Sequence, residues 1–274
     1  MFNKVVIIGT GLIGGSLGLA LKKQHLAAQV IGFSRQQKNA RLAKKAGAID
    51  QIGLSLDVVA DADLVVLATP IDTIIDFALK IEKKIKQGCI VIDVGSTKER
   101  IVSKVGVFIP NFLGCHPLAG SEKKGILNLQ ENIFKGSICI ITPTAKTKKN
   151  VLNKVKLLWK KLGARVIILS AKKHDQVLAF TSHLPHAVAF SLISSVPGQY
   201  LNLGSTGLKD TTRISSSDAN LWSEIFLSNR SNLLNVLSVF NSKLAALKLA
   251  LASKNKGQLV KILVSAKQKR EKLK

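Results

Sequence analysis

The sequence has few cysteines, and it has no long uninterrupted hydrophobic run. Three cysteines in 274 residues, Cys89, Cys115 and Cys139, are too few and too widely spaced for a disulfide framework or a paired-cysteine metal site. The longest apolar stretches, such as 5–8 and 64–68, are far shorter than the roughly 20 residues of a membrane-spanning helix. The first apolar segment is followed by a glycine turn, which is unlike a signal peptide. We therefore expect a cytoplasmic protein with no membrane segment.

Acidic residues are also scarce, with 16 against 41 lysines and arginines, so the formal net charge is +25. A charge of this sign attracts nucleic acids, anionic lipids and polyanionic small ligands, and it does not choose among them. The lysines are scattered along most of the chain, which favours a solvated basic surface. Because the sequence has no helix-turn-helix, zinc finger or RNA-binding aromatic pair, we expect no nucleic-acid partner and no membrane partner.

Short apolar runs alternate with helical stretches through the first part of the chain. The runs predict strands at 5–8, 29–33, 64–68, 89–94, 112–115, 138–142 and 165–169. Beyond about residue 174 the spacing is helical, with helices expected at 178–195, 220–251 and 257–272. This order predicts an α/β fold with an N-terminal Rossmann-type, doubly wound dinucleotide-binding domain over 1–172 and an all-α domain over 173–274.

The helical part carries more apolar surface than a small domain easily buries. The stretch 220–251 has apolar residues at intervals of three and four, which form a stripe that must be covered. The stripe can belong to the core of the helical domain, but about 100 residues have a limited interior. We therefore expect a homodimer through this domain. The segment 201–218, rich in glycine, serine and threonine, is expected to be a connecting loop.

A glycine-rich turn directly follows the first predicted strand and precedes a predicted helix. Its residues are Gly9, Thr10, Gly11, Leu12, Ile13 and Gly14. Glycines in this order permit a tight turn, close approach of a pyrophosphate to the backbone, and close packing of helix on strand. A glycine turn without a ligand is the alternative, but its position between a strand and a helix favours dinucleotide binding at the helix N-terminus.

The end of the second predicted strand bears on which dinucleotide binds. Folds that prefer NAD place an acidic residue there, whereas this sequence has Ser34 and Arg35. A guanidinium would pair with a 2′-phosphate, so we predict NADP as the preferred cofactor, with NAD as the alternative. Arg35 could equally be an ordinary exposed arginine. The other predicted cofactor-binding residues are Thr69 and Pro70, which follow the next predicted strand.

Four further motifs occur in order along the chain, at residues 93–98 (DVGSTK), 114–122 (GCHPLAGSE), 181–186 (TSHLPH) and 208–214 (LKDTTRI). Together they resemble the prephenate and arogenate dehydrogenase family of tyrosine biosynthesis. The resemblance implies a dehydrogenase that oxidises the ring alcohol of a cyclohexadienol, passes a hydride to NADP or NAD, and releases the ring carboxylate as carbon dioxide. The expected substrate is prephenate, which gives 4-hydroxyphenylpyruvate. Arogenate, or both compounds, remains open.

The resemblance also assigns roles to individual residues. His116 is expected on a loop at the carboxyl edge of the sheet, as the base that accepts the hydroxyl proton, with simple packing as the alternative. Ser96 matches the serine that bonds the substrate hydroxyl, and it could also cap the following helix. The implied substrate-binding residues are Ser121, Ser182, His186 and Arg213, of which the arginine would bind a carboxylate.

Several other interpretations remain beside this one. His183 and His186 could share a helix face, but no third ligand lies at motif spacing, so no metal is expected. His25 and His174 are expected at the surface or the domain boundary, and Trp222 is expected to pack. Another β-hydroxyacid dehydrogenase of the same layout would use a lysine base. A dinucleotide-sensing protein that binds nucleic acid would bind DNA in a salt-dependent way.

Overall fold

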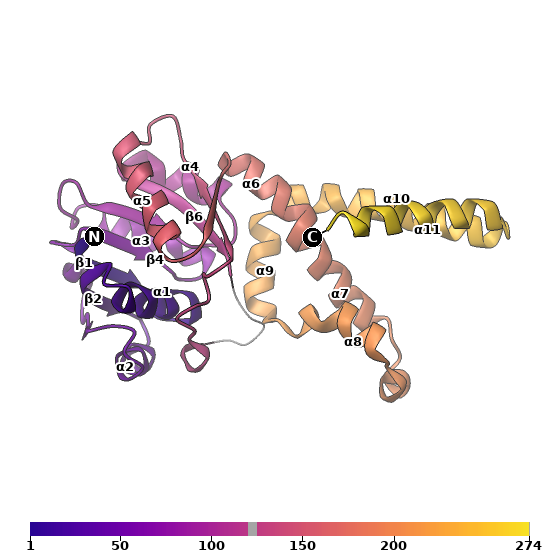
Figure 1. The fold of residues 1–274 in the computed structure, drawn as a ribbon, viewed down its shortest axis with the longest axis horizontal. Helices are drawn as coiled ribbons and strands as arrows, with labels where there is room; N and C mark the ends of the chain where they lie inside the picture. The colour runs from indigo at the N-terminus through magenta and orange to yellow at the C-terminus, as the bar shows by residue number, and fades with distance from the viewer. Residues whose placement is uncertain (120–124, 274) are drawn as a thin grey trace. The chain divides into compact units, whose positions relative to one another are not determined.

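The computed structural model describes residues 1–119 and 125–273 and divides the chain into two compact units, Met1–Asn229 and Arg230–Lys274 (Figure 1). The second unit contains the helices α10 (Arg230–Ala252) and α11 (Lys256–Glu271). The first unit contains one sheet. Its strands are β1 (Phe2–Ile8), β2 (Ala27–Phe33), β3 (Gln51–Ile52), β4 (Leu64–Leu67), β5 (Ile90–Asp93), β6 (Phe112–Leu118), β7 (Ile138–Thr142) and β8 (Arg165–Ile168).

The helices of the first unit lie between these strands and after the last of them. They are α1 (Leu12–Lys23), α2 (Gln37–Lys45), α3 (Ile71–Ile81), α4 (Glu99–Phe108), α5 (Lys149–Lys161), α6 (Ala171–Leu178), α7 (Leu184–Ser194), α8 (Thr206–Thr212) and α9 (Ala219–Ser228). A π-helical segment, Ala179–His183, joins α6 to α7 without a break. Such π-helical turns are rare and frequently occur at functional sites.

The strands are ordered β3-β2-β1-β4-β5-β6-β7-β8. Every pair from β3 to β6 is parallel, whereas β7 is antiparallel to β6 and parallel to β8. The chain reverses its direction of travel across the sheet between β1 and β4, and doubly wound folds bind ligands at the carboxyl ends of strands at such a point. The predicted fold class, a doubly wound α/β domain followed by helices, is confirmed.

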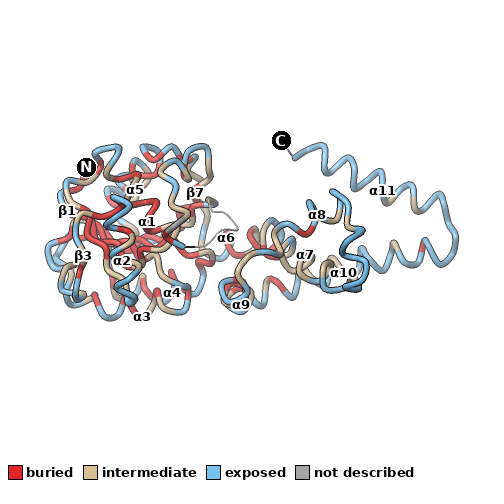
Figure 2. Tube along the Cα trace, turned by 90° about the horizontal axis from the view of Figure 1, so that it is seen from below, coloured by how far each residue is buried: buried red, intermediate tan, exposed pale blue. Residues whose placement is uncertain are grey.

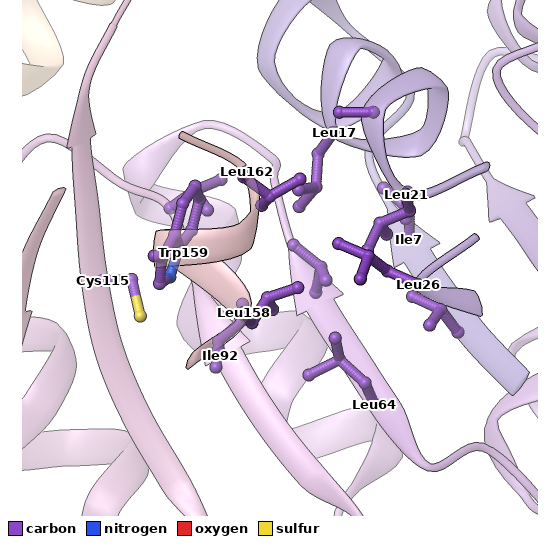
Figure 3. Packing of buried hydrophobic residues seen from close by; sticks show 14 of the residues in the cluster. Ile7, Leu17, Leu21, Leu26, Leu64, Ile92, Cys115, Leu158, Trp159 and Leu162 are labelled. Atoms are coloured by element: carbon purple, nitrogen blue, oxygen red, sulfur yellow. The ribbon is translucent and has the colours of Figure 1, made fainter. Parts of the chain in front are cut away.

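Both faces of the sheet are buried, as expected for parallel strands covered by helices. In β1, Val5 and Ile7 belong to a core with α1, α2 and α5, whereas Val6 and Ile8 belong to a second core with α3 and α4. Figure 3 shows the first core, in which Trp159 of α5 is completely buried. The period-two alternation of β1 therefore supplies both cores, and the tight packing fixes where the strand ends lie.

The helical part differs from the sequence prediction in three places, the first of which is α6, which begins at Ala171 ahead of the helix expected over 178–195. The expected helix 220–251 is interrupted, because α9 ends at Ser228 and α10 begins at Arg230. Asn229 lies at the break, and its side-chain amide donates to the main-chain carbonyl of Asp175, 2.8 Å away. The expected loop 201–218 contains α8. Local apolar periodicity does not reveal a break that is stabilised by a distant partner.

Two helical stretches, Ala171–Ser194 and Arg230–Ala252, are long and apolar enough to cross a membrane by length and composition. This is weak evidence, because apolar helices of other proteins pass the same test. The sequence expectation considered only uninterrupted apolar runs, and both stretches contain polar residues. In the second unit, α11 has no buried residue among those described (Figure 2). Large exposed side chains there include Leu234, Leu244 and Leu263.

The first core predicts the effect of removing its largest side chain. Trp159→Ala should lower the free energy of unfolding by about 3–5 kcal/mol, because the site is enclosed and cannot collapse around the cavity. Leu157→Ala, on the exposed side of the same helix, should change it by less than about 0.5 kcal/mol. Urea unfolding followed by circular dichroism measures both. Equal effects of the two variants would contradict the packing described here.

Candidate active site

A cavity of about 450 Å³ opens at the carboxyl ends of β1, β2 and β4. It brings together seven of the predicted cofactor-binding residues, namely Gly9, Thr10, Gly11, Ser34, Arg35, Thr69 and Pro70. The other three, Leu12, Ile13 and Gly14, form the first turn of α1 and are not among the lining residues. The glycine turn thus lies between β1 and α1, as the sequence predicts.

The geometry of this turn fits a dinucleotide. Gly9 has a φ of +101°, and a Cβ there would lie 2.4 Å from the carbonyl oxygen of Ala68. A Cβ at Gly11 would meet nothing within 4 Å, so the backbone there faces open space. The side-chain oxygens of Thr10 and Thr69 are buried and have no hydrogen-bond partner among the described residues. Phosphate or ribose oxygens could satisfy these hydroxyls and the free N–H groups at the start of α1.

A second cavity, of about 520 Å³, lies at the carboxyl ends of β5 and β6. Ser96, from the loop after β5, and His116, near the end of β6, both line it. Ser182 of the π-helical segment and His186 of α7 line the same cavity. Four of the six residues predicted for catalysis and substrate binding therefore converge on one space.

The other two predicted residues are not among the described residues that line this cavity. Ser121 lies outside the described residues. Arg213 begins a short 3₁₀ turn, is exposed, and does not line the cavity in the described structure, although the next residue, Ile214, does. The charge of Arg213 nevertheless reaches the site. Burial is the main cause that lowers the pKa of His186, and the positive charge of Arg213 lowers it further.

His116 differs in one respect from its prediction, because it lies within strand β6 and not on a loop. It pairs with Ile140 of the antiparallel strand β7, which extends β6 beyond the end of β5. Its imidazole keeps part of its surface accessible to the cavity. Burial, followed by the nearby His174 and Lys98, holds the pKa of His116 well below its ordinary value of 6.5. A neutral imidazole near pH 7 follows, and such a group can accept a proton.

Sequence analysis missed the two residues behind His116. The Nδ1 atom of His116 lies 2.8 Å from Nε2 of His174, and Nδ1 of His174 lies 2.7 Å from Oδ1 of Asp175. His174 was expected at the surface or the domain boundary and is instead completely buried. The adjacent histidine and aspartate are visible in the sequence, but nothing there pairs them with His116.

The side chain of Asp175 also caps the N-terminus of α4. Its two carboxylate oxygens accept the backbone N–H groups of Lys98 and Glu99, at 2.8 and 2.9 Å. A carboxylate is favourable at a helix N-terminus. The alternative interpretation of Ser96 as the cap of this helix is therefore wrong, and Ser96 lines the cavity.

A fully buried ion pair lies beneath these residues. The ammonium of Lys98 contacts Oδ2 of Asp93, and neither side chain is exposed. Burial raises the pKa of Asp93, against the lowering effect of Lys98. Buried charges are tolerated only when paired, so the two residues restrain the β5–α4 loop that carries Ser96.

The two histidines around the π-helical segment make protein contacts. His186 stacks on Trp222, with ring centroids 3.4 Å apart, and its Nδ1 lies 2.9 Å from the carbonyl oxygen of Ser182. His183 is buried, which lowers its pKa to about 4, and its Nδ1 lies 3.0 Å from the amide of Asn229. Within the described part of the chain, no three His, Cys, Asp or Glu side chains are grouped to hold a metal.

Comparison with protein families identifies the chain. Residues 17–168 match the nucleotide-binding domain of prephenate dehydrogenase, and residues 170–265 match the prephenate dehydrogenase dimerization domain. The chain belongs to the prephenate dehydrogenase family. These two matched segments meet close to the place where the strands end and α6 begins.

Individual members of this family resemble the chain over most of its length. Prephenate dehydrogenase of Bacillus subtilis is 34% identical over 85% of this chain, which spans 66% of that relative. Cyclohexadienyl dehydrogenase of Zymomonas mobilis is 32% identical, with 93% of this chain and 90% of the relative covered. The crystal structure of prephenate dehydrogenase from A. aeolicus, in complex with hydroxyphenyl propionate and NAD+, superposes with a TM-score of 0.94 at 32% identity. It covers 100% of this chain and 99% of that one.

The open space at Gly11 allows a direct test of the dinucleotide crevice. Gly11→Ala should fold normally, because its φ of −73° suits alanine and the added methyl meets no protein atom. The methyl would occupy the approach of a pyrophosphate, so the Kd for the dinucleotide should rise at least about tenfold, equivalent to about 1.4 kcal/mol. Gly106→Ala in α4, also free of contacts, is the matched control. Titration calorimetry measures both, and an unchanged Kd for Gly11→Ala would argue against this crevice.

Proposed function

We propose that the chain catalyses the oxidative decarboxylation of prephenate to 4-hydroxyphenylpyruvate, with hydride transfer to NADP or NAD, in tyrosine biosynthesis. The observation that carries this proposal is the convergence of His116 and Ser96 on one cavity at the carboxyl edge of the sheet. The strand that precedes Ser96 pairs with β4, whose end borders the dinucleotide crevice. A base and a hydroxyl thus lie beside a site that fits a hydride acceptor.

The residues divide the chemistry between them. A nicotinamide dinucleotide supplies the hydride acceptor for the hydrogen on the alcohol carbon. His116 accepts the proton of the ring hydroxyl at Nε2, and the Ser96 hydroxyl bonds the same oxygen and orients it. The bond from the ring to its carboxylate then breaks, and carbon dioxide leaves because the product is aromatic. The electrons of that bond pass through the ring to the former alcohol oxygen, which takes the proton back from His116. The neutral state of His116 permits the first of these proton transfers.

The substrate carries carboxylates, and polar residues that include Ser96, Thr181 and Ser182 line the cavity. Arg213 precedes the lining residue Ile214 and would pair with a carboxylate of the substrate, with which its guanidinium can form two parallel hydrogen bonds. Ser182 and Ser121 would add polar contacts, and His186, held flat against Trp222, would present its ring edge. Arogenate differs from prephenate by an amino group in place of a keto group, so it is the second candidate substrate. The name of the Zymomonas relative, a cyclohexadienyl dehydrogenase, is compatible with either.

We further propose the organisation of the active protein. The dinucleotide-binding part comprises 1–172 and the helical part 173–274, since the cofactor-binding residues precede this boundary and His186 follows it. The exposed apolar side chains of α10 and α11 favour a homodimer through the helical part. One of the two apolar stretches, Ala171–Ser194, carries His183 and His186 of the site, which favours a cytoplasmic enzyme over one embedded in a bilayer.

The activity can be tested with the purified chain in four assays that combine prephenate or arogenate with NAD or NADP. Reduced nicotinamide should form in at least one. His116→Gln should lower kcat by about 10²–10⁴-fold while dinucleotide binding persists, because only the base is lost. In the unmutated protein, kcat/KM should be constant near pH 7 and fall only well below pH 6.5, as His116 becomes protonated. Four silent assays with folded, dinucleotide-binding protein would refute the proposed reaction.

The preference for NADP depends on Arg35, which lines the crevice beside Ser34. Arg35→Asp should lower the ratio of kcat/KM for NADP to that for NAD by at least about tenfold, or about 1.4 kcal/mol, since a carboxylate repels a 2′-phosphate and accepts from ribose hydroxyls. Arg41→Asp, an exposed residue of α2 outside the crevice, makes the same change in net charge and should leave the ratio unchanged. If both variants alter the ratio equally, the general field of the protein, and not Arg35, sets the preference.

A further inference from the structure

Three side chains from two distant segments form a continuous chain of hydrogen bonds. His116 of β6 contacts His174 of α6 at 2.8 Å, and His174 contacts Asp175 at 2.7 Å. His174 is completely buried and Asp175 is 2% exposed, while His116 lines the cavity. Of these three hydrogen-bonded side chains, only that of His116 can therefore contact a substrate.

The direction of the hydrogen bonds follows from Asp175. Both of its oxygens accept backbone N–H groups, from Lys98 and Glu99, so the carboxylate acts as an acceptor at each oxygen. The proton between Asp175 and His174 then belongs to Nδ1 of His174. A neutral imidazole with a proton on Nδ1 has a lone pair on Nε2. His116 must donate its Nδ1–H to that lone pair, which leaves its own Nε2 without a proton.

This assignment requires His174 to be neutral. A doubly protonated His174 would donate to His116, and Nε2 of His116 would then carry the proton. Burial, the largest cause, lowers the pKa of His174, and the Lys98 ammonium also lowers it, whereas Asp175 and Asp93 act in the opposite direction. The net effect is a lowered pKa, which keeps His174 neutral near pH 7. The buried ion pair beneath the site thus supports the same arrangement.

We propose that His174 and Asp175 are positioning residues that hold His116 in the tautomer with a free Nε2, the only neutral form able to accept a proton from the cavity. The catalytic part of this inference rests on the proposed function, and the tautomer itself does not. When His116 takes up a proton, the positive charge is linked to the Asp175 carboxylate through one neutral imidazole. Asp175 also links the orientation of the base to the N-terminus of α4, which begins three residues after Ser96.

The tautomer can be measured directly by ¹⁵N NMR on protein labelled at its five histidines, with no substrate present. The chemical shifts of Nδ1 and Nε2 distinguish the two neutral forms. His116 should carry its proton on Nδ1, and the His116→Gln variant assigns its signals. In Asp175→Asn, the new amide can donate to Nδ1 of His174, so the proton of His116 should move, at least in part, to Nε2.

Steady-state kinetics of the same variants gives the second readout. Asp175→Asn should lower kcat by at least about tenfold with KM within about twofold, because the general base is lost and binding is kept. His174→Gln offers an amide oxygen to His116 and should keep both the tautomer and most of kcat. His174→Leu offers no acceptor and should lose both. A general effect on packing would not separate Gln from Leu in this way.

The controls separate this inference from the proposed reaction. His25→Asn, at an exposed histidine with a φ of +52°, should leave the His116 signals and kcat unchanged. Should Asp175→Asn fail to fold, the His174 pair still decides the matter. A proton on Nε2 of His116 in the unmutated protein, or equal tautomers in His174→Gln and His174→Leu, would overturn the inference. The expected tautomers without turnover of either substrate would support it and refute the proposed reaction alone.

Discussion

The arrangement of the candidate site depends on one carboxylate, that of Asp175. It accepts two backbone N–H groups at the start of α4 and lies 2.7 Å from Nδ1 of His174. The main-chain carbonyl of the same residue accepts the amide of Asn229 at the end of α9. Because Asp175 is buried, each of these donors compensates for its loss of water. These hydrogen bonds connect α6, the helix that follows the last strand, to the start of α4 beside the candidate site.

Burial has a second consequence for the chemistry. Burial lowers the pKa of His116, His174 and His183, so these three imidazoles stay neutral near pH 7. The buried Lys98 lies close to His116 and His174. Neutral imidazoles can act as directional donors and acceptors, whereas imidazolium ions can only donate. The polar network can then orient His116, the member of the hydrogen-bond chain that lines the cavity. The same environment makes the pairing of Lys98 with Asp93 necessary, since either charge alone would be costly to bury.

Much of the fold could be predicted from the sequence because its causes are local. The predicted strands recur in the structure within a few residues at either end, and among the described strands the short β3 alone was not predicted. The glycine turn was placed correctly between β1 and α1, because its glycines are required by the local backbone geometry of a few residues. The helical part was predicted less well. A break at Asn229 and the helix α8 within an expected loop depend on partners far away in the chain.

The sequence by itself determined the doubly wound domain, the dinucleotide turn and the residue types that converge on the second cavity, since apolar periodicity and motif order depend on neighbours in the chain. The tertiary structure decided which groups meet. It put His116 in a strand extended by β7, gave the cap of α4 to Asp175 in place of Ser96, and buried His174 behind the base. Hydrogen bonds between residues 58 and 77 positions apart have no local signature, so only the folded chain could assign them.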